Sequence, residues 1–210
     1  MSRLSNSPRV QKGAIVAIDP LFPVPTVIAF QYNPATMTRS LKPNMATDGA
    51  SKAEIRRLEK PPTETISLKA EFDATDGLEV RDPTAVSLGV YPQLSALERL
   101  IYPSSAVVIA NTVLMALGFI EIIPPAAPMT LFVWGPKRVV PIKLDSLSIE
   151  ETAYDERLNP IQATADLSMQ VLSYADLSLL DPSYYIFVAH QISKEAMSNL
   201  NPNNSTSTVF

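Results

Sequence analysis

The sequence predicts a mainly β fold with flanking helices (α+β), arranged as a β-barrel or a β-sandwich. Apolar and polar residues alternate along 63–73 (TETISLKAEFD) and 161–172 (IQATADLSMQVL), which is the period of a strand with one buried face. Helical spacing of apolar residues occurs in one central segment, 91–102, and again after Asp181. Because long alternating strands surround a single central helix, a closed or layered antiparallel sheet is favoured over a parallel βαβ sheet.

Length and composition predict one domain with extensions. The chain has 210 residues, of which 46% are hydrophobic, and this is enough to bury a sizeable core. We expect a flexible arm over 1–12 and a β-barrel domain over 13–175. A helical extension with a disordered tail is expected over 176–210.

Charge and cysteine content argue against several functional classes. The net charge is −4 and the pI is near 5.1, which gives no general affinity for nucleic acid or anionic membranes. The chain has no cysteine, which excludes disulfides and thiolate metal sites and fits a reducing compartment. Residues 143–210 hold 3 basic and 9 acidic side chains, whereas 1–142 hold 14 and 12. That gradient suits head-to-tail stacking of copies, although a solvated acidic face is the commoner reason for such a split.

The first half of the chain predicts four strands. β-Branched and aromatic residues cluster in 14–18 and 26–32. A turn at Asn33-Pro34 leads into a third strand over 37–41, which pairs with its predecessor as a hairpin. In the fourth, 63–73, the alternation places four apolar residues on one face: Ile66, Leu68, Ala70 and Phe72.

Segments of different character separate these strands from the second half. Residues 43–62 are polar and charged and are expected to form a surface loop with at most a short helix over 52–59. A helix over 92–102 should bury one stripe, made of Leu94, Leu97, Leu100 and Ile101. Residues 107–123 are mostly apolar but shorter than the roughly 20 residues that span a bilayer. We expect a buried helix and strand there, and no membrane insertion.

The second half predicts three more strands and a final helix. A short apolar strand is expected over 128–134, and 161–172 is the longest run with one inward side. Along 139–151 neither face is apolar throughout, which indicates a β-bulge or a switch of exposed face. Asp181 and Pro182 are typical of a helix start, and apolar residues then recur at helical spacing through about Ser198: Tyr185, Val188, Ala189, Ile192 and Ala196.

The chain offers few groups for catalysis. His190 is the only histidine, and no serine or cysteine nucleophile accompanies it in a recognisable motif. Glu150 and Glu151 are adjacent on a strand and point to opposite faces, so they cannot converge on one substrate. Four acidic residues recur every third position, in an arrangement that favours turns and helix caps over a calcium site: Asp73, Asp76, Glu79 and Asp82. With no phosphate-binding loop either, we expect no enzyme activity, no cofactor and no metal.

Several short motifs occur in an order that resembles the tube-protein family of contractile injection systems, the phage-tail-like particles of bacteria. FQYNP at 30–34 resembles the family's early turn, and 62–73 resembles the strand that follows. The later motifs are a proline-led Phe-x-Trp-Gly strand, an aromatic-acidic pair, and a strand introduced by proline. The matching residues are Pro128, Phe132, Trp134, Gly135, Tyr154, Asp155, Pro160, Gln162, Ala163 and Ala165. The turn at 157–159 departs from the family because it lacks glycine, and Asn159 is expected to supply the left-handed conformation there.

The resemblance implies a β-barrel protomer that forms a hexameric ring in the inner tube. Trp134, beside Phe132 and Gly135, is expected to fill the barrel end as a core residue. Because only a short helical tail follows the barrel, we hypothesise a tube initiator, an adaptor between tube and spike. Its helix over 183–198 would dock on a baseplate neighbour or pack on its own barrel, with four candidate anchors: Tyr184, Tyr185, Ile186 and Phe187.

This reading implies a structural protein whose partners are other particle subunits. They are copies of itself, the inner-tube protein, the spike or hub protein and the baseplate subunits, with no nucleic acid. Assembly would take place in the bacterial cytoplasm, into a particle that is either membrane-anchored or released. Two alternatives remain open: the bulk inner-tube subunit, and, from a different class, a ligand-binding β-barrel module with an aromatic-lined pocket.

Overall fold

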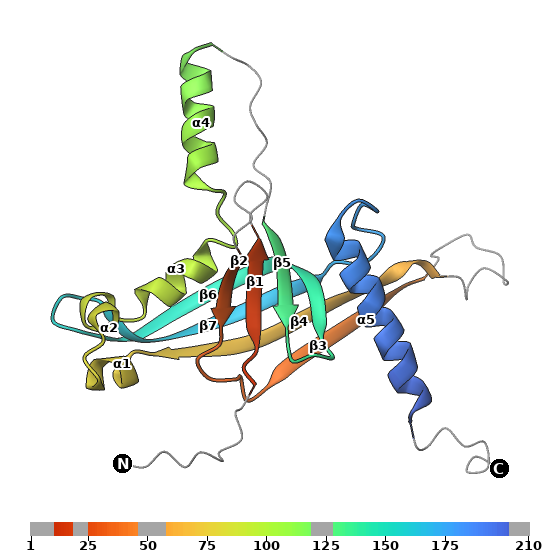
Figure 1. Ribbon diagram of the computed structural model, residues 1–210, viewed down its shortest axis with the longest axis horizontal. Coiled ribbons are helices and arrows are strands. Elements are labelled where there is room, and N and C mark those ends of the chain that lie inside the picture. Colours follow the sequence, from red (N-terminus) through yellow and green to blue (C-terminus); the bar gives the residue numbers. More distant parts are fainter. Residues whose placement is uncertain (1–10, 19–24, 46–57, 119–127, 202–210) are drawn as a thin grey trace.

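Seven antiparallel strands form one sheet in the order β2-β1-β5-β6-β7-β4-β3 (Figure 1). The computed structural model describes residues 11–18, 25–45, 58–118 and 128–201. The strands are β1 (Ala14–Ile18), β2 (Pro25–Ala29), β3 (Met37–Met45), β4 (Leu58–Asp73), β5 (Met129–Val133), β6 (Val139–Tyr154) and β7 (Pro160–Val171). The helices are α1 (Thr75–Glu79), α2 (Pro83–Leu88), α3 (Tyr91–Glu98), α4 (Ser105–Ala116) and α5 (Pro182–Asn199). The mainly β, α+β class predicted from the sequence is therefore confirmed.

The sheet is open, so the predicted barrel is wrong for the part of the chain that the structure describes. β2 and β3 are its two edges. The side chain of Gln31, just past β2, spans the gap to the end of β4: its Nε2 donates to the carbonyl of Asp73 at 2.6 Å and its Oε1 accepts from the Asp73 N–H at 2.9 Å. One side chain thus makes the contact that a ladder of backbone hydrogen bonds would make in a closed barrel.

The core lies on the apolar face of the sheet, as the alternation predicts. β4 and β7 pair in register with Leu68 opposite Leu167. The short strands β1, β2 and β5 cross the long strands in the view of Figure 1 and add Ile15, Phe30 and Phe132, each fully buried. Because each large apolar side chain contributes about 1.5–3 kcal/mol on burial, this face accounts for most of the packing energy.

β6 contains the predicted bulge. Its register against β7 shifts between Leu144, which pairs with Met169, and Ser146, which pairs with Ser168. Asp145 is the extra residue, and it returns the following apolar positions, Leu147 and Ile149, to the core side. The bulge thereby keeps one face apolar although the sequence pattern changes phase.

The predicted loop over 43–62 is partly strand, which corrects the sequence expectation. β3 runs to Met45 and β4 begins at Leu58, while residues 46–57 and the short helix expected over 52–59 fall, wholly or in part, outside the described residues. Prolines in this ribbon cannot donate ladder hydrogen bonds. Asn44 compensates by donating from Nδ2 to the carbonyl of Pro61 at 2.6 Å.

Two helical expectations need correction. α3 ends at Glu98, and Ile101, expected in the buried stripe, is 52% exposed because the chain has left the helix there. α4 lies in the segment expected to be buried, yet only Val107 of that helix is buried. Within the described ranges, no helix has the length and apolarity needed to cross a bilayer. Residues 119–123, expected to continue as a strand, lie outside those ranges.

Local hydrogen bonds show the roles of two of the four acidic residues that recur every third position, Asp73 and Asp82. Asp82 caps α2 by accepting from the N–H groups of Thr84 and Ala85, and Asp73 accepts from the N–H of Thr75. These are the turn and cap roles that the sequence favoured. α1 and α2 themselves were not predicted, because each is too short to show a helical period.

The turn between β6 and β7 uses a different residue from the one expected. Leu158, not Asn159, has the positive φ, at 63°. The Asn159 side chain is engaged in hydrogen bonds to Asp155 Oδ2 at 2.8 Å and to the carbonyl of Ser87 at 3.2 Å. The Asn159 side chain therefore links the turn to α2, and Leu158 adopts the left-handed conformation instead.

Trp134, expected to be a core residue, is half-buried and packs against the core. Its ring lies 5.8 Å from that of Phe132 in a stacked arrangement and 6.4 Å from that of Phe30. Gly13 allows this position, since a Cβ there would lie 2.5 Å from the Trp134 ring. The pairing of glycine and tryptophan holds β1 against the β5–β6 turn.

Replacing Gly13 with alanine should therefore destabilise the fold. The added methyl group would push the Trp134 ring from its site, at a cost of about 1–3 kcal/mol typical of overpacking. Urea unfolding followed by circular dichroism measures this loss. In a Trp134→Phe background, where the ring is smaller, Gly13→Ala should cost less, and an equal cost in both backgrounds would contradict the contact.

Candidate assembly surfaces

The second face of the sheet is polar across four neighbouring strands. Cross-strand pairing aligns Thr38, Ser67, Ser168 and Ser146 in one row. Further rows hold Lys69, Asp166 and Ser148, then Glu71, Thr164 and Glu150. All ten are exposed or half-buried, so none of the described elements covers this face. Hydroxyls and charges of both signs make this surface polar, although the hydroxyl of Thr164 is itself buried and has no hydrogen-bond partner among the described residues.

A shallow groove of about 330 Å³ follows this polar face between β3, β4, β7 and β6. Its lining has no aromatic side chain: Thr36, Thr38, Ser67, Leu68, Lys69, Ser146, Ser148, Asp166, Leu167 and Ser168. Small-ligand sites are predominantly apolar and enclosed. The polar lining of this groove is therefore more typical of a solvent-facing surface than of a ligand site.

Among the described residues, the edge strands β2 and β3 each have a ladder partner on one side only, and past the end of β2 the Gln31 side chain bonds Asp73 at the end of β4. The N–H of Phe30 donates to the carbonyl of Gly13 at 2.9 Å, which fixes the direction in which N–H groups point along the preceding strand. Since these directions alternate, the N–H of Ile28 points toward β1, whereas those of Val27 and Ala29 point away from the sheet. An edge with outward donors is a template for pairing with another chain.

α5 presents its polar side to the sheet and its apolar side to solvent. Its inward face consists of Ser183, Phe187, His190 and Lys194, of which Ser183 and His190 are buried. Phe187 packs on the core and lies 6.1 Å from the ring of Tyr174. The opposite face carries an exposed stripe of uncharged residues: Tyr185, Ala189, Ile192 and Ala196. Ordinary amphipathic helices have the reverse arrangement.

The candidate anchors on α5 therefore divide between the two sides. Phe187 belongs to the fold of its own chain, and Tyr185, 62% exposed, faces outward. Tyr184 and Ile186 are half-buried between them, with the Tyr184 and Tyr185 rings 5.4 Å apart. Of the earlier candidates, Phe132 is fully buried in β5, and Gly135 takes a positive φ of 71° in the turn after it.

A cluster of charged groups lies beneath α5, at the β3–β4 side of the apolar face. Glu64 accepts from Arg39 Nε at 2.8 Å and from Lys194 Nζ at 3.2 Å, and it joins β3, β4 and α5. His190 and Arg138 lie close enough to Glu64 and Arg39 to interact electrostatically with both. Sequence reasoning missed the cluster, although Glu64 shares the inward parity of Ile66 and so signals a charge on the apolar side.

The cluster determines the protonation of its members. Burial raises the pKa of Glu64, but the hydrogen bond from Arg39 and the charge of Lys194 outweigh it, so the pKa lies below its ordinary value of 4.5. Burial, together with the charges of Lys194 and Arg39, lowers the pKa of His190 below 6.5 despite the opposing effect of Glu64 and of a hydrogen bond to the Lys137 backbone. Near neutral pH, Glu64 is thus ionised and His190 is neutral.

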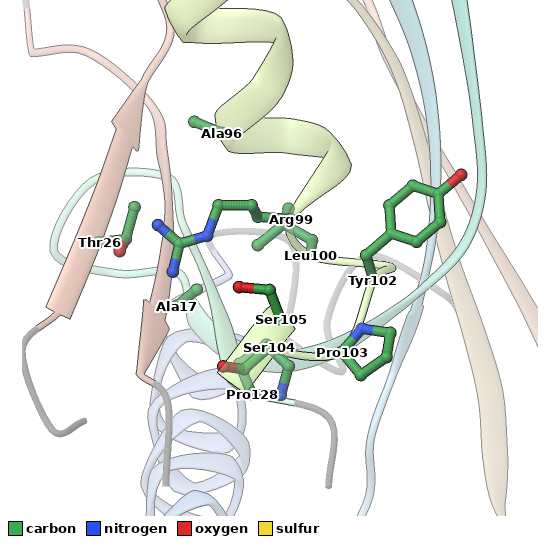
Figure 2. A pocket seen from close by; sticks show the side chains of 10 residues that line it. All are labelled: Ala17, Thr26, Ala96, Arg99, Leu100, Tyr102, Pro103, Ser104, Ser105 and Pro128. Carbon is green, nitrogen blue, oxygen red and sulfur yellow. The ribbon is translucent and has the colours of Figure 1, made fainter. Parts of the chain in front are cut away.

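A second cavity, of about 350 Å³, lies between the end of α3 and the strands β1 and β2 (Figure 2). Arg99 extends across it toward Thr26, while Tyr102 points the other way. Among the described lining residues Arg99 is the only charged one, and the others are Leu100, Tyr102, small residues and prolines. No cluster of three or more potential metal-binding side chains occurs within the described residues.

Comparison with known proteins gives remote structural matches. No protein-family model and no curated protein matches the chain. The tail of an empty gene transfer agent particle, in C6 symmetry, matches at 12% identity and a TM-score of 0.31, over 76% of this chain and 90% of that one. The virion of the native gene transfer agent matches at 11% identity and 0.29, with the same coverages. The six-fold symmetrised baseplate of the anti-feeding prophage matches at 13% identity and 0.26, over 82% and 94%. TM-scores this low do not establish a common fold.

Acid should weaken the fold in two steps. The pKa values of His190 and Glu64 are lower in the folded chain than in the unfolded chain, so the unfolded chain binds protons more readily. The free energy of unfolding therefore decreases as the pH is lowered. The fall should begin below about pH 6.5 through His190 and continue below about 4.5 through Glu64. Urea unfolding at pH 7.5, 5.5 and 4 measures both steps.

Substitution separates the two steps. His190→Gln should remove the upper step, whereas Glu64→Gln should remove the lower one and cost about 1–3 kcal/mol at pH 7.5 through its charged hydrogen bonds. Glu71→Gln, on the exposed face of the same strand, is the matched control and should change little. Equal stabilities of Glu64→Gln and Glu71→Gln at pH 7.5 would refute the role given to the cluster.

Proposed function

We propose that the chain is a structural subunit of a contractile injection particle. Six copies form a ring that initiates the inner tube and joins it to the spike and baseplate. The observation that carries this proposal is a sheet with one packed face, one polar face that no described element covers, and two edge strands with a ladder partner on one side only among the described residues. The resemblance of its sequence motifs to the tube-protein family supports the same assignment.

Ring formation gives each of these surfaces a role. Edge strands of neighbouring copies pair with each other, which removes exposed backbone donors and acceptors. Because β2 and β3 are different strands, the contact is head-to-tail, and such contacts close into rings when the rotation fits. The packed face with its helices then lies outside, and the polar rows line a water-filled lumen.

The adaptor role rests on the elements outside the sheet. α5 presents an apolar stripe to a neighbouring subunit, while the acidic second half of the chain offers one stacking face. The partners are the inner-tube protein, the spike or hub protein and baseplate subunits, and assembly takes place in the bacterial cytoplasm. The bulk inner-tube subunit is the alternative within this class, and it differs by having many rings per particle.

A ligand-binding module is the alternative from another class. The cavity beside Arg99 is the feature that favours it, since its volume suits a small molecule. Its lining offers one charged group and no aromatic ring stacked across it. The polar face and the edge strands would have no role in such a module, so the structural assignment accounts for more of the molecule.

Blocking the β2 edge should prevent assembly without unfolding the chain. Val27→Pro removes an N–H that points away from the sheet and leaves the ladder to β1 in place. We expect a folded monomer by circular dichroism, and at least about a tenfold rise in the concentration needed for rings by native mass spectrometry.

Val27→Thr is the matched control, because it keeps the N–H group and β propensity at the same position. It should assemble like the wild-type chain. Rings formed equally well by Val27→Pro would show that β2 does not pair between copies, and a wild-type chain that remains monomeric at high concentration would overturn the ring itself.

A further inference from the structure

α4 is an apolar helix with one covered stripe, where Val107 is buried and Asn111 and Leu114 are half-buried, and a broad exposed face. In Figure 1 it projects away from the sheet. No charged residue occurs from Ser104 to Gly118, and large apolar side chains are exposed on the rest of the helix surface: Val108, Ile109, Val113, Met115 and Leu117. A helix that is apolar all round is normally buried. α4 is therefore built to be covered by another surface.

The outward stripe of α5 is a second apolar surface without a partner. At 100° per residue, Tyr185, Ala189, Ile192 and Ala196 fall within one narrow sector of the helix. Tyr185 and Ile192 are 62% and 60% exposed. The two alanines allow another helix to approach closely, and no charge interrupts the stripe.

On the same side of the sheet, α4 begins near one edge, while α5 packs mainly over β6 and extends toward the other edge. The start of α4, at Ser104 and Ser105, borders the same cavity as Thr26 of the edge strand β2. α5 reaches the other edge, where Lys194 bonds Glu64 and through it Arg39 of β3. α3, which precedes α4, and α5 both pack on the apolar face, because Leu94, Leu97 and Phe187 join one core.

We propose that α4 of one copy packs against the outward α5 stripe of the next copy, as an outer clamp across the junction between the two sheets. This inference rests on the ring proposed above. When β2 of one copy pairs with β3 of the next, α4 and the neighbouring α5 come to the same junction on the same side. A second copy covers both apolar surfaces at once, whereas a different partner would have to cover each one separately.

Cross-linking between single-cysteine variants tests the clamp, since the native chain has no cysteine. Val113→Cys and Ile192→Cys copies are mixed in equal amounts under assembly conditions and oxidised. We expect a disulfide-linked dimer containing one copy of each variant, identified by mass spectrometry. The double variant should give a ladder of linked chains that ends at the closed ring.

Gln191→Cys is the matched control, since it is exposed on the same helix, one residue away, but points off the stripe. Its yield with Val113→Cys should be at least about fivefold lower. Preferential dimers of Val113→Cys with itself would mean that α4 pairs with α4, and equal yields for positions 191 and 192 would mean that α5 is not the target. Either result overturns the inference.

The ring is scored separately by native mass spectrometry of the same samples. Rings without the expected disulfide would overturn the clamp and leave the proposed function standing. A wild-type chain that forms no ring would overturn both. Binding of a baseplate protein to the α5 stripe of assembled rings would also contradict the clamp, because the stripe would then be free.

Discussion

Antiparallel pairing between β4 and β7, from Glu64 opposite Val171 to Asp73 opposite Gln162, separates two faces of different chemistry. On one side, alternate residues such as Phe72 and Met169 exclude water and hold the helices and short strands in place. The other side carries rows of hydroxyl-bearing and charged residues. A one-residue slip would exchange the two faces, so the hydrophobic pattern fixes the register strongly. The bulge at Asp145 extends the same separation into β6.

The isolated chain leaves three kinds of surface unsatisfied: backbone donors at the β2 edge, the apolar helix α4, and the apolar stripe of α5. The first leaves backbone hydrogen-bonding groups without a strand partner, and the other two expose apolar area. One head-to-tail contact between copies can satisfy all three. The charge cluster around Glu64 contributes by holding α5 with its polar side inward, and so keeps the apolar stripe available.

Features set by local pattern could be predicted from the sequence. The alternation in 63–73 and 161–172, the phase change in β6 and the cap at Asp181 each leave a direct signal, and Asp181 accepts from the N–H of Ser183 as expected. Whether the sheet closes could not be predicted, because it depends on whether distant strands meet, and the only bond described here between the ends of β2 and β4 is that of the Gln31 side chain to Asp73. α4 was expected to be buried because apolar sequence signals burial without saying which chain supplies the cover. The role of Glu64 could not be predicted, because its inward-facing carboxylate is paired with Lys194 of α5, and the sequence does not show that α5 packs above β4.

A subunit-resolving electron cryomicroscopy map of the assembled protein tests the central claim most directly. The account predicts a closed six-membered ring in which β2 of each copy pairs with β3 of the next and the row Thr38, Ser67, Ser168 and Ser146 faces the lumen. A monomer, or an oligomer whose polar rows face outward and whose edges remain unpaired, would contradict it.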